Sequence, residues 1–200
     1  ILHFPVFISF LIGIITAILL NFLIEVFIYK PAYIKKASLL TSLISSMGCY
    51  GIIVNLIAIL FGNETKIISS EIEKSFQFGN VILTRIQIIQ FMSFIFLFIL
   101  YLFFLKKTKF GKLIRAFSDN PDLLFTQGID ILNLRKLVFL ISGVFAGVAS
   151  CLVAIDVGMD PNVGMNVLLV GMVSLIIGGV GRFESVVLGG FLIGIIQNFV

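Results

Sequence analysis

The residues that most often carry out enzyme chemistry are scarce in this chain. It contains one histidine, two cysteines and ten carboxylates. A metal site needs several such ligands close together, and a nucleophile needs a base beside it. His3 has no neighbouring ligand in sequence, and Cys49 and Cys151 lie in separate apolar runs, where a thiol behaves as a small apolar side chain. We therefore expect no enzyme, no catalytic residues and no metal site, and find no basis for a disulfide framework.

A stripe of small and polar residues runs along the segment 37–61. Its members recur at helical spacing and so share one face: Thr41, Ser45, Gly48, Ile52 and Asn55. An unsatisfied Asn55 amide in lipid would cost several kcal/mol, so this face must meet protein or a wet cavity. Two interpretations stay open. The stripe makes hydrogen bonds to a neighbouring helix, or Thr41, Ser45, Gly48 and Asn55 line a pathway.

Glycines gather in the last third of the chain, where 11 of 18 lie at or after position 143. Gly143 and Gly147, like Gly190 and Gly194, have the spacing that lets two helix backbones approach closely in lipid, and we expect them to pack helices. A further cluster resembles the broken helices that line pathways in transporters, and gives three more lining candidates: Gly178, Gly179 and Gly181.

Segment 106–136 contains its own helix signals. After five basic residues suited to lipid phosphates, Asp119 or Asn120 can cap a helix, Pro121 suits its first position and Asp122 favours its dipole. Gly128 supplies the stop. The predicted helix is too short to be stable alone. It therefore docks on a soluble partner or lies on the membrane surface, with Leu123, Leu124 and Ile129 as anchors.

Two further stretches bear on partners. The segment 156–166 has two acids, Asp156 and Asp160, and no basic residue. It is either a solvated loop or a surface that pairs with a basic rim on an extracytoplasmic protein. Gly111-Lys112 is not followed by Ser or Thr, and no phosphate-binding loop occurs. If ATP powers this protein, the nucleotide must bind another chain.

The elements that position these residues are membrane helices. The chain is 60% hydrophobic and 12% charged, which predicts an all-α integral membrane protein. Four uncharged runs are long enough to span a bilayer, at 4–28, 37–61, 86–105 and 137–155. Shorter apolar runs at 167–180 and 185–200 predict a discontinuous, Gly-rich helix pair. We expect one transmembrane domain over residues 1–200, and interpret the chain as part of a longer one because it begins and ends within apolar runs.

The basic residues predict which ends face the cytoplasm. Segments 29–36 and 106–136 and Arg182 hold eleven of the fourteen, and segment 62–85 holds the other three. The positive-inside rule places the first group in the cytoplasm, in a cell membrane. Glu25 is close enough to a helix end to reach the interface. The absence of charge in mid-span disfavours proton-driven transport.

Three stretches give the sequence a resemblance to a known family. The first is Glu25-Val-Phe-Ile-Tyr29-Lys30-Pro31, which runs on into the segment ending at Gly48 and into 61–63. The second is Gly111-Lys-Leu-Ile-Arg115-Ala116, followed by 119–121 and 128–129. The third is the Gly-rich stretch 178–194. Together they resemble the branched-chain amino-acid ABC importer permeases, although Lys30, Leu124-Phe125 and Arg182-Phe-Glu184 depart from the usual family residues.

This resemblance implies a permease subunit that moves branched-chain amino acids inward by alternating access. It implies that an ATP-binding subunit docks on residues 118–129, here named the docking element, through Ser118, Asp119, Asn120, Pro121, Asp122, Leu123, Leu124 and Gly128. It also implies a second permease subunit, and an extracytoplasmic binding protein for which Asp156 and Asp160 are the contact candidates. We expect membrane lipid and no nucleic acid among its partners, and no cofactor on this chain. Alternatives are the same importer for urea, short amides or simple sugars, and a non-transporting membrane scaffold.

Overall fold

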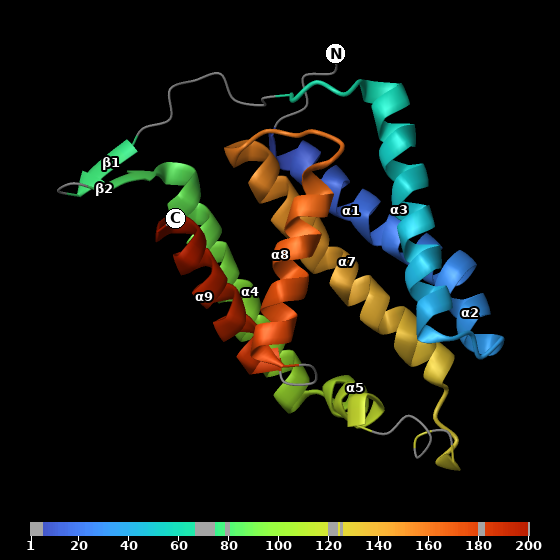
Figure 1. The fold of residues 1–200 in the computed structure, drawn as a ribbon. Coiled ribbons are helices and arrows are strands. Elements are labelled where there is room, and N and C mark those ends of the chain that lie inside the picture. The colour runs from blue at the N-terminus through green and yellow to red at the C-terminus, as the bar shows by residue number, and fades with distance from the viewer. Residues whose placement is uncertain are drawn as a thin grey trace. The chain divides into compact units, whose positions relative to one another are not determined.

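The computed structural model describes residues 6–66, 75–78, 81–119, 124, 126–179 and 183–199. Helices dominate this part of the chain (Figure 1). Four stretches are long and apolar enough to cross a membrane: Ile8–Ile34, Leu40–Phe61, Arg85–Lys107 and Ile131–Asp156. The protein is an all-α, multi-pass membrane protein, as its composition predicts.

The first membrane helix is longer than the sequence predicts. It comprises α1 (Val6–Ile24), the π-helical turn η1 (Glu25–Tyr29) and α2 (Lys30–Ile34). Pro31 lacks an N–H and its ring crowds the carbonyl four residues earlier, which breaks a regular α-helix. Widening the preceding turn accommodates it: the Lys30 N–H bonds to the Glu25 carbonyl, five residues back. The helix therefore continues through residues we expected to form a connection.

The next long helices are α3 (Leu39–Phe61), α4 (Arg85–Lys107) and α7 (Ile131–Asp156). The prediction for α7 was six residues short at its start, because Arg135 and Lys136 made 131–136 resemble a polar connection. Between α4 and α7 lies α5 (Lys109–Asp119), a helix where we expected only a basic stretch. It is amphipathic, and it packs on both α4 and α7.

A short hairpin, which the sequence did not suggest, precedes α4. Strands β1 (Ser75–Phe78) and β2 (Val81–Thr84) pair antiparallel, with Ser75 opposite Thr84. Gln87 accepts a hydrogen bond from the Thr84 backbone N–H at 3.2 Å. This contact closes the first turn of α4 as a capping box does.

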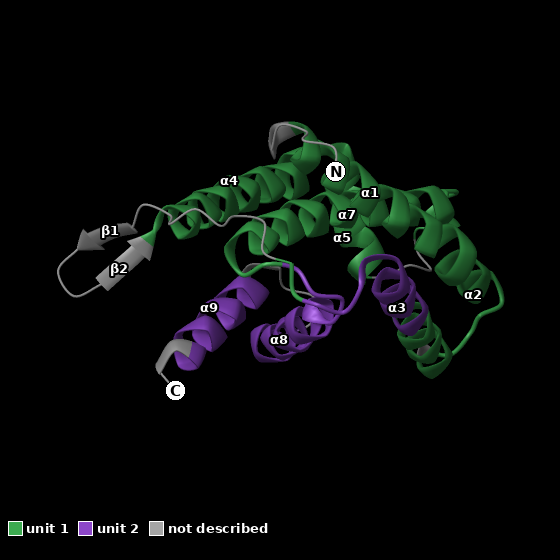
Figure 2. Cartoon of the chain, turned by 90° about the horizontal axis from the view of Figure 1, so that it is seen from above, with its two compact units in different colours: residues 1–50, 65–158 green, residues 51–64, 159–200 purple. Residues whose placement is uncertain are grey.

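The chain divides into two compact units, residues 1–50 with 65–158 and residues 51–64 with 159–200 (Figure 2). In the first, α1 lies along α7, and α4 and α5 contact α7 from elsewhere on its surface. In the second, α8 (Val163–Gly178) packs on α9 (Phe183–Phe199). These two correspond to the predicted shorter helix pair. Large apolar side chains such as Phe27 and Ile59 are 73% and 84% exposed, as suits helices that meet lipid or further protein.

Candidate functional site

The turn from α4 into α5 permits only glycine at one position. Thr108 is the single residue between the two helices, and its hydroxyl donates to the Phe104 carbonyl at 2.6 Å and accepts from the Gly111 N–H at 3.0 Å. A Cβ at Gly111 would collide with the carbonyl oxygens of Phe104 and Leu105. Gly111 therefore fixes the direction in which α5 leaves the end of a membrane-spanning helix.

The docking element is described in part. Ser118 and Asp119 are exposed at the end of α5, whereas four of its predicted members lie outside the described residues: Asn120, Pro121, Asp122 and Leu123. Leu124 is 5% exposed. Gly128 has φ of 73°, and the next residue, Ile129, donates its N–H to the Leu124 carbonyl at 3.2 Å. This is the arrangement of a helix end with a left-handed glycine, so the helix stop that the sequence predicts at Gly128 is present.

Helix α7 begins three residues after Gly128. Asp130 caps it, because its Oδ1 accepts the N–H groups of Leu132 at 3.0 Å and Asn133 at 3.3 Å. The Asn133 amide also donates to Asp130 Oδ2 at 2.7 Å. Ile131 and Leu134 are buried in the same turn. The docking element is thus joined directly to the anchored start of a membrane helix.

One turn further along α7, Arg135 forms a buried ion pair that the sequence analysis missed. Its Nε donates to Glu25 Oε1 at 3.0 Å and its Nη2 donates to Glu25 Oε2 at 3.3 Å. Glu25 is 1% exposed. Our expectation that this carboxylate reaches the interface was wrong, because a partner 110 residues away holds it inside. A carboxylate next to a long apolar run was the available signal, since such a group needs a cation.

The contact between α1 and α7 continues from this pair as a close-packed seam. A Cβ at Gly143 would lie 2.9 Å from the Ile18 Cα, and one at Gly147 would lie 3.0 Å from the Ile14 Cα. The predicted packing role of these two glycines is confirmed. At the far end, a Cβ at Gly13 would lie 2.8 Å from the Cys151 sulfur, so this thiol fills space between the helices.

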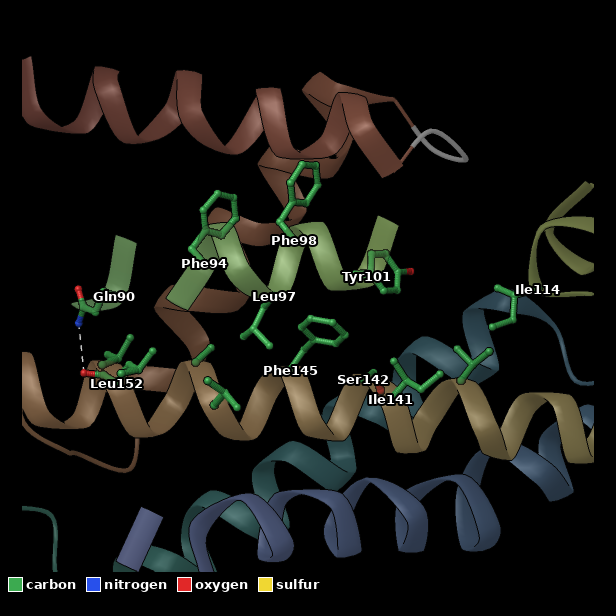
Figure 3. Close-up of a pocket in the computed structure, with 14 residues that line it drawn as sticks. Gln90, Phe94, Leu97, Phe98, Tyr101, Ile114, Ile141, Ser142, Phe145 and Leu152 are labelled. Atoms are coloured by element: carbon green, nitrogen blue, oxygen red, sulfur yellow. Dashed lines mark hydrogen bonds between the residues drawn. The ribbon is translucent and has the colours of Figure 1, made fainter. Parts of the chain in front are cut away.

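An apolar cavity of about 610 Å³ lies between α4 and α7 (Figure 3). Aliphatic side chains and four aromatic rings form its wall. The rings are those of Phe94 and Phe98 and the edge-to-face pair of Tyr101 and Phe145, whose centroids are 5.3 Å apart. Among the lining residues that the structure describes, none is charged. A free amino acid would find no charged partner for its carboxylate or ammonium here, so the lining suits an apolar group rather than an amino acid.

The candidate lining residues on α3 lie on an open face. The Asn55 amide donates to the Gly51 carbonyl of its own helix at 2.7 Å, which uses one of its two N–H groups. A Cβ at Gly48 or Gly51 would meet no atom within 4 Å. Thr41 forms a hydrogen bond with Ser38 at the start of the helix, and Ser45 is half-buried. The stripe is present as a face, and its lining role stays a prediction.

The second group of lining candidates is packed differently. A Cβ at Gly178 would collide with the backbone of Ser185 and Val186, and one at Gly189 would lie 2.5 Å from the Ser174 carbonyl oxygen. Gly178 therefore brings α8 and α9 together, while Gly179, with φ of 84°, ends α8. Gly181 lies outside the described residues. Our expectation for the spacing of Gly190 and Gly194 was only partly right, because a Cβ at Gly194 would meet nothing within 4 Å.

The two candidate contacts for a binding protein both have intramolecular partners. Asp156, exposed at the end of α7, accepts a hydrogen bond from the Gln90 amide at 3.3 Å. Asp160 accepts one from the Asn162 N–H at 2.6 Å, which stabilises a turn. Within the described part of the chain, no three His, Cys, Asp or Glu side chains gather in a way that could hold a metal ion.

Comparison with known proteins identifies the family. Residues 2–200 match the family described as the branched-chain amino acid transport system permease component. The chain belongs to this family. It is 26% identical over 198 residues to the high-affinity branched-chain amino acid transport system permease protein BraD of Pseudomonas aeruginosa, a match that covers 96% of the chain and 64% of BraD.

The names of the other relatives include both amino-acid and sugar permeases. The chain is 34% identical over 96 residues to the probable branched-chain amino acid transport permease protein LivH of Methanocaldococcus jannaschii, covering 48% of the chain and 30% of LivH. It is 37% identical over 103 residues to the D-allose transport system permease protein AlsC of Escherichia coli, covering 48% of the chain and 32% of AlsC. The chain thus spans less than two thirds of each of these relatives. No solved structure matches it.

Proposed function

We propose that this chain is part of the transmembrane subunit of an ATP-driven importer that moves branched-chain amino acids into the cell. The observation that carries the proposal is the family match over residues 2–200. For the cargo, the match to BraD extends over 96% of the chain, whereas LivH and the D-allose, xylose and L-arabinose permeases each match about half of it. A simple sugar is the alternative cargo that these matches favour.

In this proposal the chain conducts substrate and other chains supply the energy. A cytosolic ATP-binding subunit docks on residues 118–129, a second permease subunit completes the pathway, and an extracytoplasmic binding protein delivers the cargo to a surface that includes Asp156 and Asp160. ATP is held by the partner, so this chain needs no cofactor. The open face of α3 and the Gly-rich end of α8 are its candidate pathway walls.

Movement of the docking element would drive alternating access. Gly128 and Asp130 connect it to α7 without an intervening flexible loop, because the bend at Gly128 and the cap at Asp130 are both hydrogen-bonded. A displacement of the docking element is therefore transmitted to the start of a membrane helix. Asp119→Arg would disturb the docking surface, and Gly128→Val would strain a backbone with positive φ. Both should uncouple transport from ATP hydrolysis while membrane insertion persists.

The cargo is tested by ATP hydrolysis of the full-length permease purified with its ATP-binding subunit and binding protein. Leucine, isoleucine and valine should each stimulate hydrolysis, and D-allose, L-arabinose and urea should not. Stimulation by a sugar or urea alone would transfer the assignment to the alternative cargo. Failure of any ATP-binding subunit to co-purify with the full-length protein would favour a membrane scaffold instead.

A further inference from the structure

The Glu25–Arg135 pair joins the end of the first membrane helix to the start of α7. Glu25 opens the π-helical turn η1 at the end of α1, and Arg135 lies one turn into α7. The two guanidinium donors Nε and Nη2 reach the two carboxylate oxygens at 3.0 and 3.3 Å. Such a two-pronged contact fixes orientation as well as distance, which a single ammonium cannot do.

Aromatic contacts extend the joint beyond the charges. The Arg135 guanidinium carbon lies 4.5 Å from the centroid of the Tyr33 ring, within reach of a cation–π interaction. The rings of Tyr29 and Phe139 have centroids 5.3 Å apart. Arg135 is thereby bound to η1 through Glu25 and to α2 through Tyr33. The end of the first membrane helix and the start of α7 are held at three places.

The π-helical turn sets the direction of the residues that follow Glu25. Inserting an extra residue into a helical turn rotates everything that follows relative to a regular helix. In this chain Glu25 opens the turn and Tyr29 closes it, and Tyr29 lies against Phe139 although Pro31 follows. π-Helical turns occur often at functional sites, because an unusual turn persists where its geometry is used.

We infer that Glu25 and Arg135 are positioning residues for transport, which make η1, α2 and the start of α7 move as one body when the docking element is displaced. The inference rests on the proposed function and goes beyond it. Arg135 is seven residues after Gly128 and five after the cap Asp130, all on the anchored end of α7. Without the pair, only the Tyr29–Phe139 contact would remain of the three that hold η1 and α2 to the start of α7.

The test uses the full-length permease reconstituted in liposomes with its ATP-binding subunit and binding protein, and measures leucine uptake per ATP hydrolysed. Glu25→Leu and Arg135→Met each leave a buried charge unpaired, whereas the double variant leaves none and keeps apolar packing. The double variant should assemble and hydrolyse ATP like wild type, with uptake per ATP lower by at least about fivefold. If the pair had only a structural role, the double variant would recover the wild-type uptake per ATP hydrolysed. That result would overturn the inference.

Lys136→Gln is the matched control, because it removes the charge next to Arg135 on α7. The Lys136 Nζ donates to the Asn133 side chain rather than to Glu25. It should keep the wild-type ratio. Wild-type assemblies that hydrolyse ATP but accumulate no branched-chain amino acid would refute the proposed function itself. A normal ratio in the double variant, with normal wild-type uptake, would refute only the role of the pair.

A cross-link gives an independent answer if the double variant does not assemble. Tyr29→Cys and Phe139→Cys, in a background where Cys49 and Cys151 are replaced by alanine, can be bridged by a short thiol-specific reagent. Because η1 and α7 are inferred to move together, the bridged protein should take up leucine at the rate of the same variant after reduction. Uptake that stops on bridging and returns on reduction would contradict the inference.

Discussion

Helices α7 and α3 both carry small residues along one face, yet those faces meet different surroundings. On α7, Gly143 and Gly147 lie against the backbone of α1, with no room for a Cβ without displacing Ile18 or Ile14. On α3, a Cβ at Gly48 or Gly51 would meet nothing within 4 Å, and Ile44 and Ile52 are 71% and 69% exposed. The first face is filled by α1, whereas among the described residues nothing lies within 4 Å of the second face at its two glycines.

This difference teaches that small residues permit close helix packing without choosing the partner. In lipid the hydrophobic effect does not drive helices together, so packing and polar contacts decide which helices associate. The seam between α1 and α7 has such a contact in the Glu25–Arg135 pair. On α3, the Asn55 amide donates to the Gly51 carbonyl of its own helix. This face of α3 is our candidate for contact with the second permease subunit or with the pathway proposed above.

The largest expected effect is the loss of one member of the buried pair. Arg135→Met leaves Glu25 unpaired at 1% exposure, and should lower the free energy of unfolding by about 3–5 kcal/mol. Glu25→Leu combined with Arg135→Met should recover most of that loss, because no charge is then buried alone. Unfolding of the purified protein in mixed detergent micelles measures both. Equal destabilisation in the single and double variants would mean that the two charges do not interact.

The next effect sharpens the contrast between the two small-residue faces. Gly143→Ala places a methyl group 2.9 Å from the Ile18 Cα, a backbone atom that cannot move aside, and should cost about 1–3 kcal/mol. Gly51→Ala on α3 is the matched control and should cost nothing. The same micelle titration compares them. A neutral Gly143→Ala would show that the α1–α7 seam is looser than described.

A smaller effect is expected at the start of α7. Asp130→Ala removes the acceptor for the N–H groups of Leu132 and Asn133, and should lower the free energy of unfolding by about 1 kcal/mol. Asp130→Asn keeps a capping oxygen and should change stability much less. Amide hydrogen exchange of residues 131–134 should rise in the alanine variant alone. Identical exchange in the two variants would exclude the cap as the anchor of this helix.

The smallest effect should be a gain. Gly48→Ala adds a methyl group in open space. It also lowers the conformational entropy of the unfolded chain, so it should stabilise the helix by up to about 1 kcal/mol. Gly48→Leu tests the surroundings of the face in the assembled transporter. The side chain introduced by Gly48→Leu would fill the space at this face. Uptake of the transported amino acid should therefore fall, while the free energy of unfolding of the isolated chain is unchanged. Normal uptake with leucine at this position would remove Gly48 from the lining candidates.

Local features were predictable from the sequence. The positions of the long apolar helices follow from hydropathy, and the stop at Gly128 follows from the conformational freedom of glycine. Each depends on residues close together in the chain, so no knowledge of the folded partner was required. The packing role of Gly143 and Gly147 was predictable for the same reason, although their partner α1 was not.

Features that depend on distant residues were missed. Arg135 resembled part of a polar connection until its partner Glu25, 110 residues earlier, was known to neutralise it. The contact of α9 with α8 uses Gly189 rather than Gly194, because the rotation of a helix about its axis is set by the surface it meets. The widened turn at Glu25–Tyr29 compensates for Pro31 and begins at a buried carboxylate, a combination that local propensity does not predict.

The central claim is that this chain belongs to the conduit of an importer for branched-chain amino acids. The most direct test is ATP-dependent accumulation of radiolabelled leucine in liposomes that contain the full-length permease and its ATP-binding subunit, with the binding protein outside. Accumulation should require ATP inside, and unlabelled isoleucine and valine should compete while D-allose and L-arabinose do not. Accumulation of a labelled sugar in place of leucine, or leucine entry that is independent of ATP, would contradict the account.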